Sequence, residues 1–296
     1  MKYLLLLFPI LFFQSCRSQP VENFKTNADD NSLLWEISGN GLTKPSYLFG
    51  TFHLMCKEDI HLSGNLKEAV KNAKEVYFEM DLDDMANTMG ALLYLNMNDG
   101  KKLKDLYTAD EYARVTAFFR DSLRSSLTMM ERMKPNFLQA LLYPKMMPCK
   151  TMSGIEEAIM AIAKQDKKEI KGFETIKFQA SVFDSVPYQE QAKDLLNMID
   201  SIPAYSKYFD TMLTVYKTQQ LSALEKMFSD PRFNMDEKNQ DILLDNRNRN
   251  WVEQLKAILP KKNIFIAVGA GHLVGDKGLI SLLRKEGYTV RPLVNK

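Results

Sequence analysis

The sequence predicts an α/β (α+β) protein, in which segments from both ends of the chain build a central β-sheet and a large helical insertion separates them. Short apolar strands alternate with helical patterns near the N-terminus, and a second set of such segments closes the chain. Between about residues 84 and 245 the apolar positions mostly have helical spacing. Strands and helices in this order assemble as a sheet covered by helices.

Length and composition are those of a globular chain without a dominant charge. The 296 residues are 45% hydrophobic and 26% charged, which is ordinary for a folded protein with a substantial core. The 39 Lys and Arg residues nearly balance the 37 Asp and Glu residues, and the basic residues are scattered. We therefore expect no nucleic-acid partner, because proteins that bind nucleic acids concentrate basic residues in a patch.

The first residues are typical of an export signal. One Lys precedes an apolar block from Leu4 to Phe13, which is too short for a stable membrane span. The small Ser15 then stands before Cys16, as at the cleavage site of bacterial lipoproteins, so we expect Cys16 to carry an acyl anchor. The alternative is a soluble periplasmic protein with an ordinary signal. We divide the chain into a signal peptide, a polar spacer and one folded domain (residues 1–15, 16–30 and 31–296).

Export would place the other two cysteines in a compartment where they could form a disulfide. Cys56 and Cys149 stand outside any CxxC or Cys-His pattern, so neither nucleophilic nor zinc chemistry is indicated for them. An oxidising compartment permits a disulfide between them. Two buried thiols are the equal alternative, because the sequence does not measure their separation in space.

Alternation and turns predict the N-terminal part of the sheet. Leu33–Gly39 alternates apolar with polar residues, Gly41–Pro45 supplies a turn, and "SYLFGTFH" follows as a second strand. This order predicts a hairpin. Helical spacing from Asn65 to Ala73 then leads to "EVYFEMDL", a further strand that ends in carboxylates.

Helical patterns fill the middle of the chain. Residues 84–147 are rich in methionine, and we attribute this to packing rather than copper binding because no histidine is near. Ser153 with Glu156 three residues later predicts a capping box for a helix that runs to about Lys167. The segment "KEIKGFE" follows as a short strand. Long helices are then predicted over Lys177–Met198, Pro203–Met227 and Asp236–Leu259.

The chain closes with a second strand, helix, strand unit. Strand "NIFIAV" runs into a glycine-rich turn, and a helix from Gly278 to Glu286 leads to the last strand, "YTVRPLV". Both ends of the chain can therefore join one sheet.

Two of the three histidines follow strands at matched positions. Gly50-Thr-Phe-His53 and Gly269-Ala-Gly-His272 each end an apolar strand with glycine and place a histidine three residues later. Glycine lets the backbone turn sharply and approach a ligand, so Gly50, Gly269 and Gly271 are candidate cofactor-binding positions. If the two strands are neighbours, both imidazoles meet at the carboxyl edge of the sheet, where α/β folds place their sites. The alternative is that each histidine caps a turn or packs under a loop.

Two glutamates and an arginine complete the candidate site. Glu79 ends a strand between two apolar residues, and two imidazoles with one carboxylate suit a divalent transition metal; Glu79 could also act as general base. Glu174 ends another strand and is a candidate metal ligand or a group that orients a histidine, with helix capping as its alternative. Arg247 could clamp a substrate carboxylate or stabilise an oxyanion. Its alternative is a salt bridge from the last long helix to the sheet, with Asp245 as a candidate partner. His61 lacks the glycine turn and is expected at the surface or in a cap.

The order of these segments resembles the TraB/GumN family, to which the TIKI metalloproteases are related. The resemblance covers essentially all of the mature chain, through "LWEISG", "LFGTFH", "VYFEMD", "KKEIKGFETIKFQ", "LLDNRNRNW" and "VGAGHLVGDKGLISLLRKEGYTV". In the TIKI proteins two GxxH motifs and a glutamate are implicated in metal-dependent peptide cleavage, and the resemblance transfers these roles to His53, His272 and Glu79. It also implies manganese or cobalt rather than a closed zinc site.

The sequence thus leads to the hypothesis of a metal-dependent hydrolase, specifically a peptidase, anchored at the bacterial cell envelope. A divalent ion held by His53, His272 and a carboxylate would lower the pKa of bound water and polarise the scissile carbonyl. The expected partners are a peptide or protein substrate and the membrane that receives Cys16. The competing class is a non-catalytic envelope lipoprotein whose histidines bind haem or a metal. The sequence has no GxSxG motif and no phosphate loop, which argues against serine hydrolysis and nucleotide chemistry.

Overall fold

The computed structural model of the protein describes residues 31–84, 90–228 and 237–296. The predicted signal peptide and spacer, with Cys16, lie outside the described residues. Among the residues that are described, no helix is both long and apolar enough to cross a membrane.

A six-stranded sheet forms the centre of the molecule, with the strand order β6-β4-β7-β2-β1-β8. Neighbours from β6 to β2 are parallel, whereas β1 is antiparallel to both β2 and β8. The strands are β1 Leu34–Gly39, β2 Ser46–Thr51, β4 Glu75–Met80, β6 Glu169–Glu174, β7 Ile264–Gly269 and β8 Tyr288–Pro292. The α/β class is therefore confirmed, and both ends of the chain contribute to one sheet.

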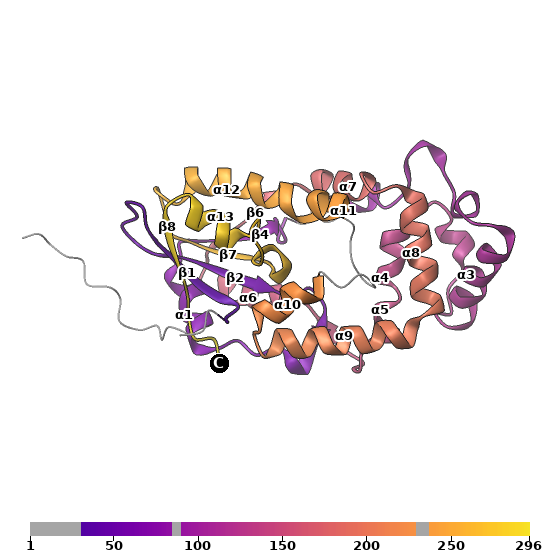
Figure 1. Cartoon of the computed structure of the whole chain (residues 1–296), viewed down its shortest axis with the longest axis horizontal. Helices are drawn as coiled ribbons and strands as arrows, with labels where there is room; N and C mark the ends of the chain where they lie inside the picture. Colours follow the sequence, from indigo (N-terminus) through magenta and orange to yellow (C-terminus); the bar gives the residue numbers. More distant parts are fainter. Residues whose placement is uncertain (1–30, 85–89, 229–236) are drawn as a thin grey trace, which may run out of the picture.

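Helices cover both faces of the sheet. Helices α1 (Gly64–Asn72) and α6 (Ile155–Gln165) lie on one side, and α12 (Asn246–Ile258) and α13 (Leu279–Lys285) lie on the other (Figure 1). This arrangement explains why β2 and β7 are almost entirely buried and read as continuous apolar runs.

The register of the three central strands decides where their ends lie. β7 pairs with β2 on one side, where Thr51 is opposite Gly269, and with β4 on the other, where Phe78 is opposite Ala267. All three strands run in the same direction, so their carboxyl ends meet at one edge of the sheet.

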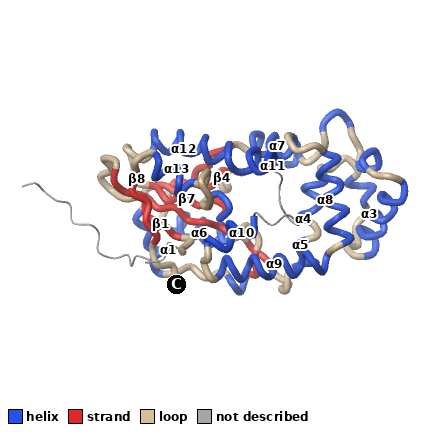
Figure 2. The backbone as a smooth tube through the Cα atoms, viewed as in Figure 1, coloured by secondary structure: helices blue, strands red, loops and turns tan. Residues whose placement is uncertain are grey.

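Helices beyond the sheet form a second lobe, at the opposite end of the molecule in Figures 1 and 2. It contains α3 (Ala109–Asp121), α4 (Pro135–Ala140), α5 (Tyr143–Met146) and α8 (Tyr188–Asp200). The lobe has its own hydrophobic core, in which Met97 and Met146 are buried. These methionines pack as predicted, whereas the side chain of Met129 is 89% exposed.

The predicted strand "KEIKGFE" is confirmed as β6, which joins the sheet and divides the helical insertion over residues 84–245 in two. Two of the three long predicted helices are broken, one at Pro187, which cannot continue a helix, and one at Gln219, which has a φ of 58°, whereas the third is continuous through a π-helical turn. The first predicted helix corresponds to α7 (Ile176–Asp184) and α8, and the second to α9 (Ile202–Lys217) and α10 (Leu221–Phe228). The third corresponds to α11 (Glu237–Gln240), a π-helical turn (Asp241–Asp245) and α12.

The start of α6 also differs from the prediction. Gly154 is the N-cap residue, and the two-residue strand β5 (Met152–Ser153) precedes it and pairs with β3 (Met55–Cys56). The carboxylate of Glu156 turns into the candidate site, where it accepts from His53, and it also bonds to its own backbone N–H rather than to that of Ser153. The predicted capping box is therefore wrong, because Gly154 rather than Ser153 is the N-cap residue and the Ser153 hydroxyl donates to Glu157.

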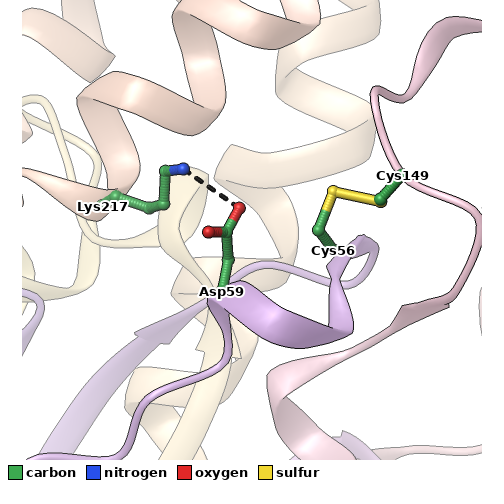
Figure 3. Close-up of a disulfide and its surroundings, with 4 residues drawn as sticks. All are labelled: Cys56, Asp59, Cys149 and Lys217. Atoms are coloured by element: carbon green, nitrogen blue, oxygen red, sulfur yellow. Dashed lines mark hydrogen bonds and ion pairs between the residues drawn. A yellow bond between two sulfur atoms is a disulfide. The ribbon is translucent and has the colours of Figure 1, made fainter.

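Cys56 and Cys149 form a disulfide, with their Cα atoms 5.7 Å apart (Figure 3). The bond joins β3 to the segment that leads into β5, and the alternative of two buried thiols is excluded. Close by, Asp59 forms an ion pair of 3.0 Å with Lys217 on α9 (Figure 3). The segment that follows His53 is therefore fixed to two other parts of the chain.

Candidate functional site

The carboxyl ends of β2, β7 and β4 position the candidate site. His53 follows β2 by two residues, His272 ends the 3-10 helical turn Ala270–His272 after β7, and Glu79 is the next-to-last residue of β4. The parallel pairing of β2 with β7 confirms that the two GxxH strands are neighbours. Residues from opposite ends of the chain therefore meet at one edge of the sheet.

Glu79 lies between the two imidazoles. Its Oε1 atom is 3.7 Å from Nε2 of His53 and 3.7 Å from Nε2 of His272, so the two nitrogens are separated by at most twice that distance. Burial raises the pKa of Glu79, but the neighbouring His272, Arg247 and His53 outweigh it and lower the pKa to about 2. Glu79 is therefore an ionised carboxylate at neutral pH.

Each histidine has its other ring nitrogen beside an oxygen. Nδ1 of His272 is 2.7 Å from Oδ1 of Asn248, and Nδ1 of His53 is 2.6 Å from Oε1 of Glu156. Because both oxygens are acceptors, each ring donates its Nδ1–H and directs Nε2 toward Glu79.

The two histidines differ in exposure and in protonation. The side chain of His272 is 4% exposed, and burial lowers its pKa to about 4 against the opposing effect of Glu79, so the ring is neutral at pH 7. The side chain of His53 is 66% exposed. Desolvation lowers the pKa of His53, but its hydrogen bond with Glu156 and the charge of Glu79 raise it above the usual range. Solvent at the exposed face of this ring screens the effect.

Arg247 on α12 connects the strand ends. Its Nη2 atom donates to Glu79 at 2.6 Å, and Nε and Nη2 both donate to Glu174. Its Nη1 atom donates to the carbonyl of Leu243 and to Nε2 of His272, which is 3.3 Å away. All five N–H donors of the guanidinium are therefore engaged within the chain. The salt bridge from the last long helix to the sheet is present, but its partners are these glutamates, because Asp245 pairs with Lys277.

Glu174, at the end of β6, pairs with Arg247 rather than with a histidine. Its side chain is 4% exposed and accepts from Arg247 and from Nε1 of Trp251 at 2.8 Å. The capping alternative is wrong, because Thr175 caps α7 through a bond from the N–H of Phe178. Any contribution of Glu174 to a metal centre would thus pass through Arg247.

Gly269 provides space rather than a sharp turn. Its φ of −49° is accessible to any residue, so the turn itself does not require glycine, and only the predicted close approach of the backbone does. A Cβ atom added there would lie 3.2 Å from Oε1 of Glu79 and 3.3 Å from Nε2 of His53. The absence of a side chain therefore keeps the space between these groups open.

The other two glycines belong to the packing around that space. A Cβ atom on Gly50 would lie 3.0 to 3.1 Å from Leu273 and Ala270, so this glycine lets the turn after β7 pack against β2. Gly271 lies inside that turn, directly before His272.

A pocket of about 520 Å³ opens beside the cluster. Its polar lining comes from His53, Glu79, Glu156, Glu157, Gln179 and Arg247. The apolar wall includes Phe78, Met80, Leu82, Met160, Val182, Phe183 and Leu243. A concave, mostly apolar space with a few converging polar groups is typical of a site that binds a small molecule or a side chain.

The donor set fits a divalent cation. Metal-binding histidines usually donate their second ring N–H to an oxygen, as both histidines do here, and a carboxylate completes the set. In the described parts of the chain, the one His/Cys/Asp/Glu triple with all ligand atoms within 4.8 Å is Cys56, Glu58 and Cys149, whose sulfurs are joined in the disulfide. Glu79 and the two histidines are spread more widely, so an ion would draw them together, and the exposed His53 ring has room to move.

Besides Glu156, which was expected only to cap its helix, two groups of the site were missed by reasoning from the sequence. Asn248 follows Arg247 directly, yet nothing in the local pattern marks it as a histidine partner. Gln179, which donates to Oε2 of Glu79 at 3.4 Å, lies one helical turn into α7 and is equally unmarked. Both contacts depend on how distant segments pack, which local periodicity does not encode.

The fold and the cluster define a mixed α/β protein with a histidine, glutamate and arginine site at the carboxyl edge of its parallel strands. The chain belongs to the TraB/PrgY/gumN family, whose match covers residues 33–292.

Similar proteins include several that are named metalloproteases. The chain is 25% identical to Metalloprotease TIKI1 of Danio rerio, over 89% of this chain and 63% of that protein. It is 23% identical to a Metalloprotease TIKI homolog of Nematostella vectensis (96% and 70%) and 24% identical to Metalloprotease TIKI1 of Homo sapiens (88% and 61%). The chain thus spans less than two thirds of the length of these two TIKI1 proteins. No solved structure matches the chain.

Proposed function

We propose that this protein is a metal-dependent hydrolase that cleaves peptide bonds at the bacterial cell envelope. The observation that carries the proposal is the approach of Nε2 of His53 and Nε2 of His272 to one oxygen of Glu79, beside a largely apolar pocket. The similarity to proteins named metalloproteases supports the same chemistry.

The proposed ligands are His53, His272 and Glu79, with manganese or cobalt favoured over zinc. A divalent ion at this position supplies a Lewis acid and lowers the pKa of a bound water. If Glu79 does not bind the ion, its Oε1 atom is placed to accept a proton from that water. The apolar wall of the pocket would receive an apolar side chain of the substrate and exclude bulk water.

Arg247 has a positioning role in this proposal. Since its N–H donors are all engaged, it holds Glu79 and Glu174 in place and balances their charge instead of clamping a substrate carboxylate. An oxyanion role would require one of these bonds to open.

Metal analysis of the purified domain tests the proposal. Wild type should bind close to one equivalent of Mn²⁺ or Co²⁺, and His53→Ala and His272→Ala should each lose most of it, because ligands of one ion act as a unit. His61→Ala is the matched control, since His61 is exposed and lies outside the cluster. Equal metal content in wild type and both site variants would refute the proposed centre.

Hydrolysis of a peptide library separates catalysis from binding alone. Cleavage should require Mn²⁺ or Co²⁺, stop with a chelator, and fall in Glu79→Gln whether Glu79 is a ligand or the base. Metal binding without cleavage of any peptide, or a Soret band on addition of haem that is lost in His53→Ala, would favour the non-catalytic alternative.

The envelope location is proposed from the N-terminal sequence. Wild type should fractionate with membranes and Cys16→Ala should not, because the acyl anchor would be absent. Equal solubility of the two proteins would exclude the anchor.

A further inference from the structure

The side-chain amide of Asn248 hydrogen-bonds to His272, and a second hydrogen bond fixes the orientation of that amide. Its Nδ2 atom donates to the carbonyl of Lys277 at 2.9 Å, so its Oδ1 atom is the one that faces Nδ1 of His272. Asn248 is 1% exposed and the ring is also buried, so water cannot take over this contact. The ring must therefore carry its proton on Nδ1.

Arg247 indicates the same tautomer from the other edge of the ring. Its Nη1 atom lies 3.3 Å from Nε2 of His272, and a guanidinium can only donate. Nε2 is therefore unprotonated, and its lone pair, which accepts from Arg247 here, would turn to an ion bound at the site. Consecutive residues of α12 thus contact both nitrogens of one ring.

Glu156 plays the corresponding part for His53, from the first turn of α6. Its carboxylate accepts the Nδ1–H at 2.6 Å. The approach depends on Gly154, where an added Cβ atom would lie 2.6 Å from Oε2 of Glu156 and 2.7 Å from the backbone oxygen of His53. A glycine before the helix therefore lets the helix start reach the histidine.

We propose that Asn248 and Glu156 are positioning residues, which hold the Nε2 lone pairs of His272 and His53 toward the space beside Gly269. The inference rests on the proposed function, because the group that these lone pairs receive is the divalent ion. Neither residue binds the ion itself; each acts through a histidine. Partners of this kind typically change metal affinity by about 10- to 100-fold when they are removed.

A chelator competition titration with Mn²⁺ measures the effect on affinity. Asn248→Ala and Glu156→Ala should each bind Mn²⁺ about 10- to 100-fold more weakly than wild type. Glu156→Gln keeps an acceptor oxygen in place and should recover most of the affinity, whereas Asn248→Asp keeps the acceptor but loses the donor to the carbonyl of Lys277 and should recover part of it. A merely structural role would not separate the alanine variants from the conservative ones in this way.

Nitrogen-15 NMR of the imidazoles tests the tautomers in metal-free protein. The chain has only three histidines, so each ring can be assigned by its own substitution. His272 should show a protonated Nδ1 and an unprotonated Nε2 in wild type, and this preference should be lost in Asn248→Ala. The exposed His61 serves as the internal reference. A protonated Nε2 on neutral His272 in wild type would overturn the inference.

Two control variants separate positioning from general damage to the fold. Asn263→Ala removes a buried asparagine that bonds the carbonyl of Asn72, and Glu75→Gln alters a glutamate paired with Lys262 at the far end of β4. Both should leave the Mn²⁺ affinity unchanged. If wild type binds no metal, the proposed function is refuted. If wild type binds Mn²⁺ no better than Asn248→Ala and Glu156→Ala, or if the two control variants lose as much Mn²⁺ affinity as these do, only the positioning roles are refuted.

Discussion

Loss of the disulfide between Cys56 and Cys149 should destabilise the protein by several kcal/mol. The two cysteines are 93 residues apart, and the loop between them contains α3, α4 and α5 of the helical lobe. A cross-link lowers the entropy of the unfolded chain, and in the chain-entropy treatment the effect grows with the logarithm of the loop length. For this loop the treatment gives about 4.6 kcal/mol at 25 °C.

Urea unfolding of a Cys56→Ser/Cys149→Ser double variant measures this loss. Trp35 and Trp251 are the only tryptophans and both are buried against the sheet, so their fluorescence reports on that core. With a urea dependence of about 3 kcal/mol/M, the midpoint should fall by about 1.5 M. Wild type treated with a thiol reductant should give the same curve as the double variant, and the reductant should not change the double variant further.

Unfolding of the oxidised and reduced forms of wild type at the same urea concentration would refute a stabilising disulfide. Two thiols that can be alkylated in denatured protein that was never reduced would refute the bond itself. A loss well below the value from the loop would mean that the unfolded chain keeps structure in the region of the helical lobe.

Three changes at the candidate site have expected outcomes of their own. Gly269→Ala should remove bound Mn²⁺ without altering the circular dichroism spectrum, because its methyl group would lie 3.2 Å from Oε1 of Glu79; elemental analysis that finds wild-type metal content would contradict this. Arg247→Met should lower the free energy of unfolding by about 3 to 5 kcal/mol, since the buried Glu174 loses its cation. Trp251→Phe removes the Nε1–H bond to Glu174 and also shrinks a fully buried ring that stacks on Phe173, so its loss should exceed the about 1.5 to 3 kcal/mol of the bond alone. Urea titrations measure both losses, and a loss below about 1 kcal/mol in Arg247→Met would show that the arginine does not stabilise Glu174.

The meeting of His53 and His272 could be predicted because both lie just beyond strands whose central residues are apolar and which end in matched glycine turns. A strand of this kind must be buried on both faces, which favours the interior of a parallel sheet, and the interior strands end at one edge. Glu79 follows from the same logic. These inferences need only the hydrophobic pattern and the position of a residue relative to a strand end.

The partners of the histidines could not be predicted in this way. Glu156 stands where a capping residue would stand, and only the pairing of β3 with β5 shows that it faces His53 instead. Asn248 reaches His272 because α12 packs over the end of β7, a contact between elements that the local sequence does not connect. The breaks in the long helices were equally hidden, apart from Pro187, because amphipathic spacing continues across them.

The central place of β7 in the sheet determines when the site can exist during biosynthesis. β2 and β4 emerge from the ribosome early, but they do not pair with each other, and β7 must insert between them. A nascent chain that has not reached residue 264 lacks both this strand and His272. The proposed hydrolase therefore has no complete site until β7 and His272 have been synthesised. A chain truncated before β7 would lack hydrolytic activity.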